Sequence, residues 1–289
     1  MERVLKNIII IVSFFLVSLE SKAERPFEIE RSEVLEFFSK KLNKTYDIAI
    51  KLPRGYQKNI SKRYPTIYLT DSGYAFPLVS SLTKQMVGGG KIDDLIIVGM
   101  SYSKEDRWDI SRTRDYTPTH SPEEKIGFSK EAKEASGGAK MYLEFINKEL
   151  FHFIDKKYRT DSSKRIFAGH SFGGLWGAYV IKVQPNTFDY YILSDPSLWY
   201  DSETVLNLRS SLSKGMTANV LIVSSNPSEP LKRGGFPHNM VANAKKLERQ
   251  LVDDLAKDSD VASEIYNGQI HETIFPVAVT QGLLRFIGN

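Results

Sequence analysis

The sequence predicts an α/β fold with a doubly wound, mostly parallel sheet and an antiparallel hairpin at its N-terminal edge. Short apolar runs alternate with amphipathic helical patterns along the second half of the chain, which is the order of strand-helix-strand units. The apolar runs are nearly continuous, as in strands that helices cover on both faces. No repeat, low-complexity segment or Pro/Gly-rich linker divides the 289 residues, so one large domain is expected.

Composition excludes several classes of protein. Hydrophobic residues make up 41% and charged residues 26%, which is ordinary globular usage and argues against a disordered, collagen-like or coiled-coil chain. The net charge is +4, from 39 basic and 35 acidic residues, and the basic residues are scattered, so nucleic acid is a poor first guess as a partner. The absence of cysteine excludes disulfides, thiolate metal sites and a cysteine nucleophile.

The first residues have the pattern of an export signal. Two basic residues precede an apolar run from Ile8 to Leu19, which is shorter than the ~20 residues that a membrane-spanning helix needs. Ser21-Lys22-Ala23 then supplies small residues at the −3 and −1 positions of a cleavage site. We expect residues 1–23 to be a signal peptide and residues 24–289 to be a single exported domain, periplasmic or secreted, with no stable membrane insertion. The alternative is an uncleaved N-terminal anchor.

Strands dominate the first part of the mature chain. The runs 27–38 and 46–52 are rich in β-formers, and Pro53-Arg54-Gly55-Tyr56 ends the second run as a turn, which predicts the antiparallel hairpin. The runs 66–69 and 95–99 are short and almost wholly apolar, which predicts buried parallel strands.

A long polar stretch separates these strands from the regular second half. Residues 101–138 show no clear periodic signal, and loops of this length are usually functional or mobile. Residues 139–158 carry apolar side chains at spacings of three and four, which predicts an amphipathic helix. Beyond them we expect strands at 165–168, 190–193, 220–223 and 261–266, and helices at 172–183, 239–255 and 273–287.

The most informative motif is Gly169-x-Ser171-x-Gly173, between a predicted strand and a predicted helix. This is the context of a nucleophile elbow, a strained turn that lifts a serine hydroxyl above the edge of the sheet. The glycines let the strand and the helix pass close together. The amide of Phe172, at the start of the helix, can stabilise a developing oxyanion. Ser171 is therefore the candidate nucleophile.

A serine hydroxyl needs a general base, normally histidine, and five histidines are available. His152 falls within the predicted amphipathic helix, and His120 and His238 fall in polar loops. His170 adjoins the candidate nucleophile, but neighbouring side chains diverge on a sharp turn, so a supporting role is expected. His271 lies between the last strand and the last helix, where the chain order serine, acid, histidine requires the base.

The acid of the triad should follow a strand between the nucleophile and the base. Glu229 is the only carboxylate in the loop after the strand at 220–223, and it is the first candidate. Asp195, after the preceding strand, is the second. A Ser-His dyad oriented by a neutral group is the third alternative.

Several segments also resemble a known family, the Putative esterase group of α/β hydrolases, which includes esterase D-like enzymes and trilactone siderophore esterases. The likeness extends from about Phe27 to Gly288. It is carried by Tyr68-Leu69-Thr70-Asp71, Val98-Gly99-Met100-Ser101-Tyr102, Arg114-Asp115-Tyr116-Thr117-Pro118, Gly169-His170-Ser171-Phe172-Gly173-Gly174 and Asp195-Pro196-Ser197-Leu198-Trp199. The resemblance implies an α/β-hydrolase fold and ester hydrolysis without a metal or organic cofactor. It further implies Ser171 as nucleophile and His271 as base.

The resemblance also implies that the loop after Leu69 donates a second oxyanion amide. The group has Asp-Gly at this point, whereas this chain has Asp71-Ser72-Gly73, so the amide is that of Ser72 or Gly73. Candidate substrate contacts are Arg114, Trp199 and Tyr74. The alternatives are a structural ion pair for Arg114 and a core position for Trp199.

These observations together predict an exported serine hydrolase that cleaves a small-molecule ester, siderophore-type or otherwise polar, through an acyl-enzyme. One alternative is acyl transfer by the same residues to an acceptor other than water. Another is a non-catalytic exported binding protein on a hydrolase scaffold. The sequence does not predict an oligomeric state.

Overall fold

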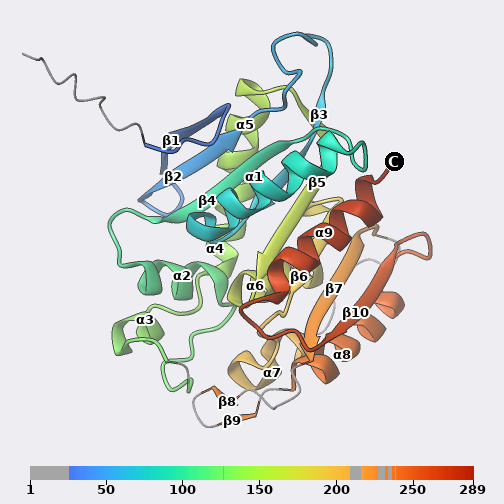
Figure 1. Ribbon diagram of the computed structural model, residues 1–289. Coiled ribbons are helices and arrows are strands. Elements are labelled where there is room, and N and C mark those ends of the chain that lie inside the picture. Colours follow the sequence, from blue (N-terminus) through green and yellow to red (C-terminus); the bar gives the residue numbers. More distant parts are fainter. Residues whose placement is uncertain (1–25, 126, 209–215, 227–231, 234–235, 238) are drawn as a thin grey trace, which may run out of the picture.

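An eight-stranded mixed sheet forms the centre of the structure, a computed structural model that describes residues 26–125, 127–208, 216–226, 232–233, 236–237 and 239–289 (Figure 1). The strand order is β1-β2-β4-β3-β5-β6-β7-β10. The strands are β1 Ser32–Ser39, β2 Lys44–Lys51, β3 Tyr64–Leu69, β4 Ile96–Ser103, β5 Thr160–His170, β6 Tyr190–Ser194, β7 Asn219–Asn226 and β10 Val261–Asn267. A separate ribbon pairs β8 Lys232–Arg233 with β9 Phe236–Pro237.

The direction of the strands confirms the predicted fold class. β1 is antiparallel to β2, and β2 is antiparallel to β4. From β4 to β10 every neighbouring pair is parallel. The carboxyl ends of β3, β5, β6, β7 and β10 therefore lie at one edge of the sheet, where α/β folds place their ligands.

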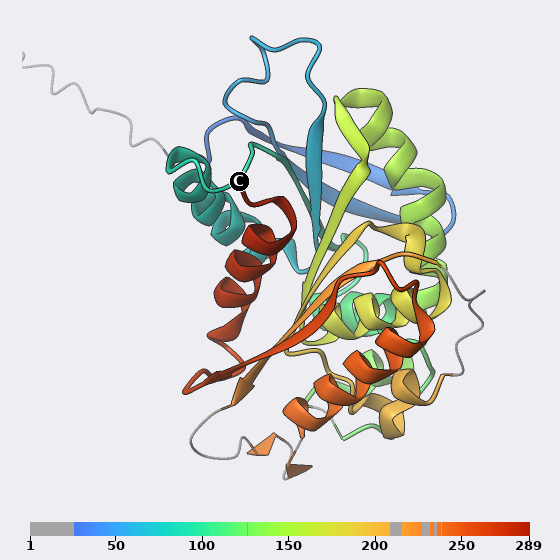
Figure 2. The same cartoon turned by 90° about the vertical axis from the view of Figure 1, so that its right-hand side faces the viewer.

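Helices cover both faces of the sheet, as Figure 2 shows. One face carries α1 and α9, and the opposite face carries α4, α5, α6 and α8. The helices are α1 Ser72–Gly88, α2 Trp108–Tyr116, α3 Lys130–Glu134, α4 Ala139–Phe145, α5 Phe151–Lys157, α6 Phe172–Val183, α7 Tyr200–Asn207, α8 Met240–Asp254 and α9 Ile274–Ile287. A π-helical turn, Ile146–Leu150, joins α4 to α5, and a 3-10 turn, Pro185–Thr187, precedes β6.

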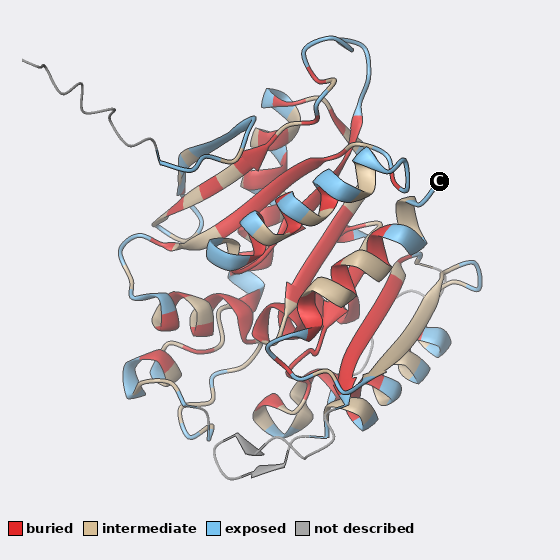
Figure 3. Cartoon of the chain, viewed as in Figure 1, coloured by how far each residue is buried: buried red, intermediate tan, exposed pale blue. Residues whose placement is uncertain are grey.

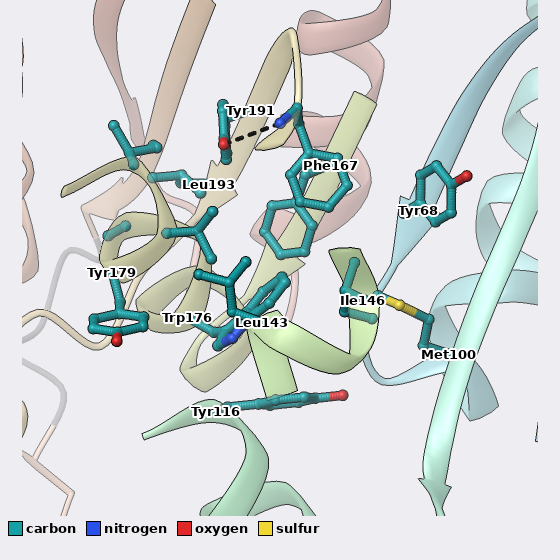
Figure 4. Packing of buried hydrophobic residues seen from close by; sticks show 14 of the residues in the cluster. Tyr68, Met100, Tyr116, Leu143, Ile146, Phe167, Trp176, Tyr179, Tyr191 and Leu193 are labelled. Carbon is teal, nitrogen blue, oxygen red and sulfur yellow. Dashed lines mark hydrogen bonds between the residues drawn. The ribbon is translucent and has the colours of Figure 1, made fainter. Parts of the chain in front are cut away.

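Two apolar clusters, one on each face, hold these layers together. Every residue of β3 is buried, and its side chains alternate between the clusters: Ile67 and Leu69 face α1 and α9, whereas Tyr68 faces the other helices. The central strands are accordingly buried along most of their length (Figure 3). Figure 4 shows Phe167 of β5 beside Trp176 of α6, with ring centroids 5.2 Å apart. This packing fixes α6 directly behind the turn that carries Ser171.

The polar stretch 101–138 contains two helices that the sequence pattern did not reveal. In α2 four of the buried residues are Asp109, Ser111, Thr113 and Asp115, so this helix packs through hydrogen bonds and ion pairs instead of an apolar stripe. A search for hydrophobic periodicity misses such a helix for that reason. The structure also adds α1 and α7, which were not predicted.

No helix among the described residues is long and apolar enough to cross a membrane. The proposed signal peptide, residues 1–23, lies outside the described residues.

Candidate active site

Ser171 occupies the turn between β5 and α6 in a backbone conformation that a residue with a side chain rarely adopts. Its φ is 58° and its ψ is −116°. A Cβ added to Gly169 would lie 2.6 Å from the backbone of Gly173, and one added to Gly173 would lie 2.2 Å from Oγ1 of Thr70. The glycines are thus required by the close approach of β5, α6 and the end of β3. Such a strained turn persists only where its surroundings hold it.

His271 lies between β10 and α9 and is paired with a buried carboxylate. Its Nδ1 atom is 3.0 Å from Oδ2 of Asp195, and the two side chains are almost wholly buried. Asp195 follows β6 and also accepts hydrogen bonds from the amide of Ser225, at 3.0 Å, and from the Ser225 hydroxyl, at 2.5 Å. These bonds hold the carboxylate toward the imidazole.

The carboxylate that contacts His271 comes from the second of the sequence-based candidates for the triad acid. Glu229 lies outside the described residues. The carboxylate that the structure places on His271 is that of Asp195, the second candidate, because the carboxyl end of β6 lies between those of β5 and β7 in the sheet. Asp195 adopts a φ of 40°, a second strained backbone position close to the Ser171 turn.

His170 connects His271 to the turn that carries Ser171. Its ring lies against the His271 ring, with centroids 4.3 Å apart, and its Nδ1 atom is 3.1 Å from Oγ of Ser194. The His271 ring therefore lies directly beside the turn that carries Ser171. His170 supports this arrangement from the side, as the diverging side chains of a sharp turn require.

The end of β6 and the segment after it contact Ser171 through two backbone hydrogen bonds. This segment contains Ser197, a residue that sequence reasoning missed. The Ser171 amide donates to the Ser194 carbonyl at 3.0 Å, and the Ser197 amide donates to the Ser171 carbonyl at 3.1 Å. The buried Ser197 hydroxyl lies 3.2 Å from the Ser171 hydroxyl. The sequence feature that could have pointed to Ser197 is its place in the Asp195-Pro196-Ser197 motif.

The candidate oxyanion amides lie at two helix N-termini beside the turn. Phe172 is the first residue of α6. Ser72 and Gly73 begin α1, after Asp71 in a left-handed conformation with φ 55°. The amide of Tyr74 already donates to the Asp71 carbonyl, whereas the first amides of a helix have no intrahelical acceptor. A Cβ on Gly173 would lie 3.5 Å from the Asp71 carboxylate, so this loop contacts the start of α6.

Asp71 is held in place by a guanidinium that the sequence analysis did not select. Arg112, from α2, donates to both Asp71 oxygens, at 2.8 and 3.1 Å, and to the His170 carbonyl at 3.5 Å. The Tyr102 hydroxyl donates to Asp71 at 2.6 Å. Burial, reinforced by the Asp71 charge, raises the pKa of Tyr102, so this hydroxyl keeps its proton. The network links the loop before α1 to the nucleophile turn.

Arg114, which was expected to contact substrate, is committed to a structural network. Its guanidinium pairs with Asp106 and with Asp115, the latter at 2.8 Å, and donates to the Tyr46 hydroxyl at 3.1 Å. Asp115 is almost wholly buried. These partners hold Arg114 inside the fold and match its alternative, a structural ion pair, while its contact with substrate stays a prediction. The arginine that bonds to the elbow is Arg112.

Aromatic side chains line the approach to the elbow. Trp199 lies 6.2 Å from Phe172 between ring centroids, Phe172 lies 5.7 Å from Phe128, and Phe128 lies 5.8 Å from Trp108. Trp108 is 56% exposed, so this aromatic row runs from the surface to the first residue after Ser171. Tyr74, the remaining candidate contact, is 43% exposed on α1.

The site offers acid-base and nucleophilic chemistry from its own side chains. Within the part of the chain that the structure describes, no group of three or more His, Cys, Asp or Glu residues is arranged to hold a metal ion.

Comparison with known proteins places this geometry in context. A family model described as "Putative esterase" matches residues 39–285. The ferri-bacillibactin esterase BesA of Bacillus subtilis is 26% identical over 272 residues, which are 89% of this chain and 90% of the relative. The solved structure of an IroE-like serine hydrolase from Shewanella oneidensis is 26% identical, with a TM-score of 0.71 over 88% of this chain and 79% of that one. The BES protein of Bacillus cereus is 25% identical, with a TM-score of 0.69 over 92% and 98%.

Proposed function

Because the chain belongs to the Putative esterase family, and is accordingly a carboxylic ester hydrolase, we propose that it is an exported serine esterase that acts through an acyl-enzyme on Ser171. The observation that carries the proposal is the Asp195–His271 pair beside the strained Ser171 turn. A histidine oriented by a buried acid next to a serine elbow is the arrangement that nucleophilic acyl transfer needs.

The reaction begins with the removal of the Ser171 proton. Asp195 accepts a hydrogen bond from Nδ1 of His271, which leaves Nε2 as the base. The Ser171 hydroxyl exchanges its contact with Ser197 for one with His271, a tightening that is common when a substrate enters an apo site. As Ser171 Oγ attacks the ester carbonyl carbon, its proton passes to Nε2 and then to the leaving alcohol.

The negative oxygen of the tetrahedral intermediate is stabilised by backbone amides. The amide of Phe172 supplies one donor and that of Ser72 or Gly73 the other, because the Asp71 network holds the start of α1 against the start of α6. Water, activated by the same histidine, then attacks the acyl-enzyme and releases the acid and Ser171.

The substrate that we propose is a small siderophore-type ester. BesA, which matches almost the whole chain, is named for an iron-siderophore ester. The aromatic row from Trp108 to Trp199 provides flat apolar surface next to the nucleophile, which suits an ester with planar groups. Export is supported by the signal-like pattern of residues 1–23.

The experiment is a substrate panel with product analysis. The purified protein is incubated with iron-loaded and iron-free trilactone siderophores, a feruloyl ester and a short-chain ester, and the products are identified by mass spectrometry. We expect free acid and alcohol from the trilactones, and labelling of Ser171 by a fluorophosphonate. Transfer of the acyl group to an added alcohol without hydrolysis would instead indicate an acyltransferase. If the fluorophosphonate does not label Ser171, the result would indicate a non-catalytic binding protein.

Arg112 provides a further prediction, as a positioning residue for the loop that begins α1. In Arg112→Lys the charge remains, but one ammonium cannot replace the two parallel bonds to Asp71. We expect kcat to fall about tenfold to a hundredfold with little change in KM, because a displaced amide loses part of the ~10²–10³ that one oxyanion donor contributes. The measurement is steady-state kinetics on a p-nitrophenyl ester.

Arg107→Lys is the matched control for this variant, because Arg107 directly precedes α2 and its exposed guanidinium pairs with the carboxylate of Asp109. It should retain wild-type kcat. Equal kcat values in Arg112→Lys and Arg107→Lys would contradict the positioning role.

A further inference from the structure

A cavity lined partly by charged side chains lies away from the Ser171 turn. It has a volume of about 130 Å³, and its lining residues come from the segment before β1, the end of β2 and the middle of α1. Figure 1 shows where β2 and α1 lie in the fold. β2 pairs with β4 so that Tyr46 faces Ser103 and Lys51 faces Ile97. Lys51 is therefore at the amino end of β4, opposite to the carboxyl edge that carries the catalytic residues.

Basic side chains from three separate elements meet at this cavity. Arg31, Lys51 and Lys84 line it, and they also line a smaller adjoining space of about 20 Å³ that Arg54 and Asp94 complete. Lys51 therefore lines both spaces, as Lys84 and Arg31 do.

The carboxylates near the two spaces either bond to other groups of the chain or lie at the outer edge of the larger cavity. Asp94 accepts the amide of Arg54 at 2.8 Å, and Glu30 pairs with Arg31 at the surface at 3.1 Å. Glu28 lines the outer part of the larger cavity and is exposed. No carboxylate among the described residues forms an ion pair with Lys51, although 92% of this residue is buried (8% exposed). Its ammonium donates only to the carbonyl of Ser80, at 2.7 Å.

The positive charge of the Lys51 ammonium is not neutralised by an ion pair with any carboxylate among the described residues. Burial lowers the pKa of Lys51 to about 8, and the charge of Arg31, followed by those of Lys84 and Arg54, acts in the same direction while Asp94 opposes it. A buried charge of this kind is normally neutralised by a partner. The remaining two N–H bonds of the ammonium have no acceptor in the described part of the chain.

Ser80 supplies an independent observation. It is 3% exposed, it lines the larger cavity, and its hydroxyl has no hydrogen-bond partner within the described residues. Buried hydroxyls nearly always have a partner, either protein or a bound molecule. Ser80 and Lys51 thus line the same cavity, and each carries a donor without a full set of partners among the described residues.

We propose that this cavity binds a small oxyanion, such as inorganic phosphate or sulfate, between the Lys51 ammonium, the Ser80 hydroxyl and the basic side chains of Arg31 and Lys84. A tetrahedral anion presents several acceptor oxygens to donors that converge from different directions. The volume is well above the ~10–15 Å³ that a single water needs, so the cavity has room for a compact ion with part of its hydration shell. The ligand class is independent of the esterase reaction, which takes place at the other edge of the sheet.

The test measures binding of inorganic phosphate and of sulfate to the full chain. Thermal unfolding and titration calorimetry at pH 7 are compared with potassium chloride at equal ionic strength. We expect saturable binding that chloride does not reproduce. In Lys84→Gln the affinity should fall about tenfold, because one charge-assisted contact is lost. Lys156→Gln, at an exposed lysine of α5, is the matched control and should bind as the wild type does.

Two buried variants test the inner donors. Ser80→Ala should weaken binding several-fold, and Lys51→Met should abolish it. Sulfate does not titrate near neutrality, so its affinity should fall above about pH 8 as Lys51 loses its proton. The other charged groups at the two spaces are Arg31, Arg54, Lys84, Asp94, Glu28 and Glu30.

Any of three results would overturn the proposal. The first is that chloride raises the melting temperature as much as phosphate or sulfate does, and the second is that Lys84→Gln and Lys156→Gln weaken anion binding equally. The third is that Ser80→Ala and Lys51→Met bind the anion with wild-type affinity. If Lys51→Met does not fold, the comparison of Lys84→Gln with Lys156→Gln and the Ser80→Ala affinity decide the question.

Discussion

Ser171→Ala is expected to remove nearly all ester hydrolysis while the protein remains folded. The loss should be at least about 10⁴-fold in kcat, because without the hydroxyl no acyl-enzyme can form and only binding and the oxyanion amides remain. Alanine keeps the Cβ of Ser171 and meets the same backbone conformation, φ 58°, so the turn should survive. The measurement is hydrolysis of a p-nitrophenyl ester, with the melting temperature as the check on folding.

Ser197→Ala is the matched control, since it removes a second hydroxyl only 3.2 Å from the first. Ser197 orients the nucleophile in the resting site but does not attack, so this variant should stay within about tenfold of wild-type kcat. Fluorophosphonate should label Ser197→Ala and not Ser171→Ala. If Ser171→Ala turned over at the wild-type rate, the nucleophile would have to be another residue.

Asp195→Asn should cause the second largest loss, about 10²–10⁴-fold in kcat. The asparagine amide can donate to Nδ1 of His271, which favours the tautomer with its proton on Nε2 and removes the base from Ser171. The Ser225 amide can still donate to the remaining side-chain oxygen, whereas the Ser225 hydroxyl loses its acceptor and must accept from the new amide, so the loop after β6 keeps part of its support. The pH dependence of kcat/KM and the melting temperature are measured together, to separate the tautomer effect from unfolding.

Glu229→Gln makes the same acid-to-amide change at the carboxylate that the chain order favoured. We expect it to keep kcat within a few-fold of wild type, because His271 already has a carboxylate on Nδ1. A severe loss in Glu229→Gln with normal kcat in Asp195→Asn would locate the acid after β7 instead.

The arrangement of the sheet was largely predictable, whereas some of its helices were not. The buried strands β3 and β4 are visible as apolar runs because helices cover both of their faces. The helix α2 buries Asp109, Ser111, Thr113 and Asp115 beside a single aromatic residue, Tyr116, and Asp115 accepts a hydrogen bond from the distant Tyr46 hydroxyl. A pattern of hydrophobicity cannot report contacts of that kind.

The sequence by itself determined the nucleophile turn and the order of the elements that surround it. A strained turn is a local property: Gly169, Ser171 and Gly173 lie within five residues, and their spacing is read directly from the chain. Chain order likewise selected His271 as the candidate base. Both inferences depend on neighbours in sequence or on the succession of strands and helices.

Only the tertiary structure decided which carboxylate contacts His271 and which arginine lies at the elbow. Asp195 is 76 residues from His271 and meets it because β6 and β10 end at the same edge of the sheet. Arg112 and Arg114 are two residues apart on α2, yet one pairs with Asp71 beside the elbow and the other with Asp106 and Asp115. Such choices depend on distances between loops that the chain brings together only when it folds, and local sequence carries no record of those distances.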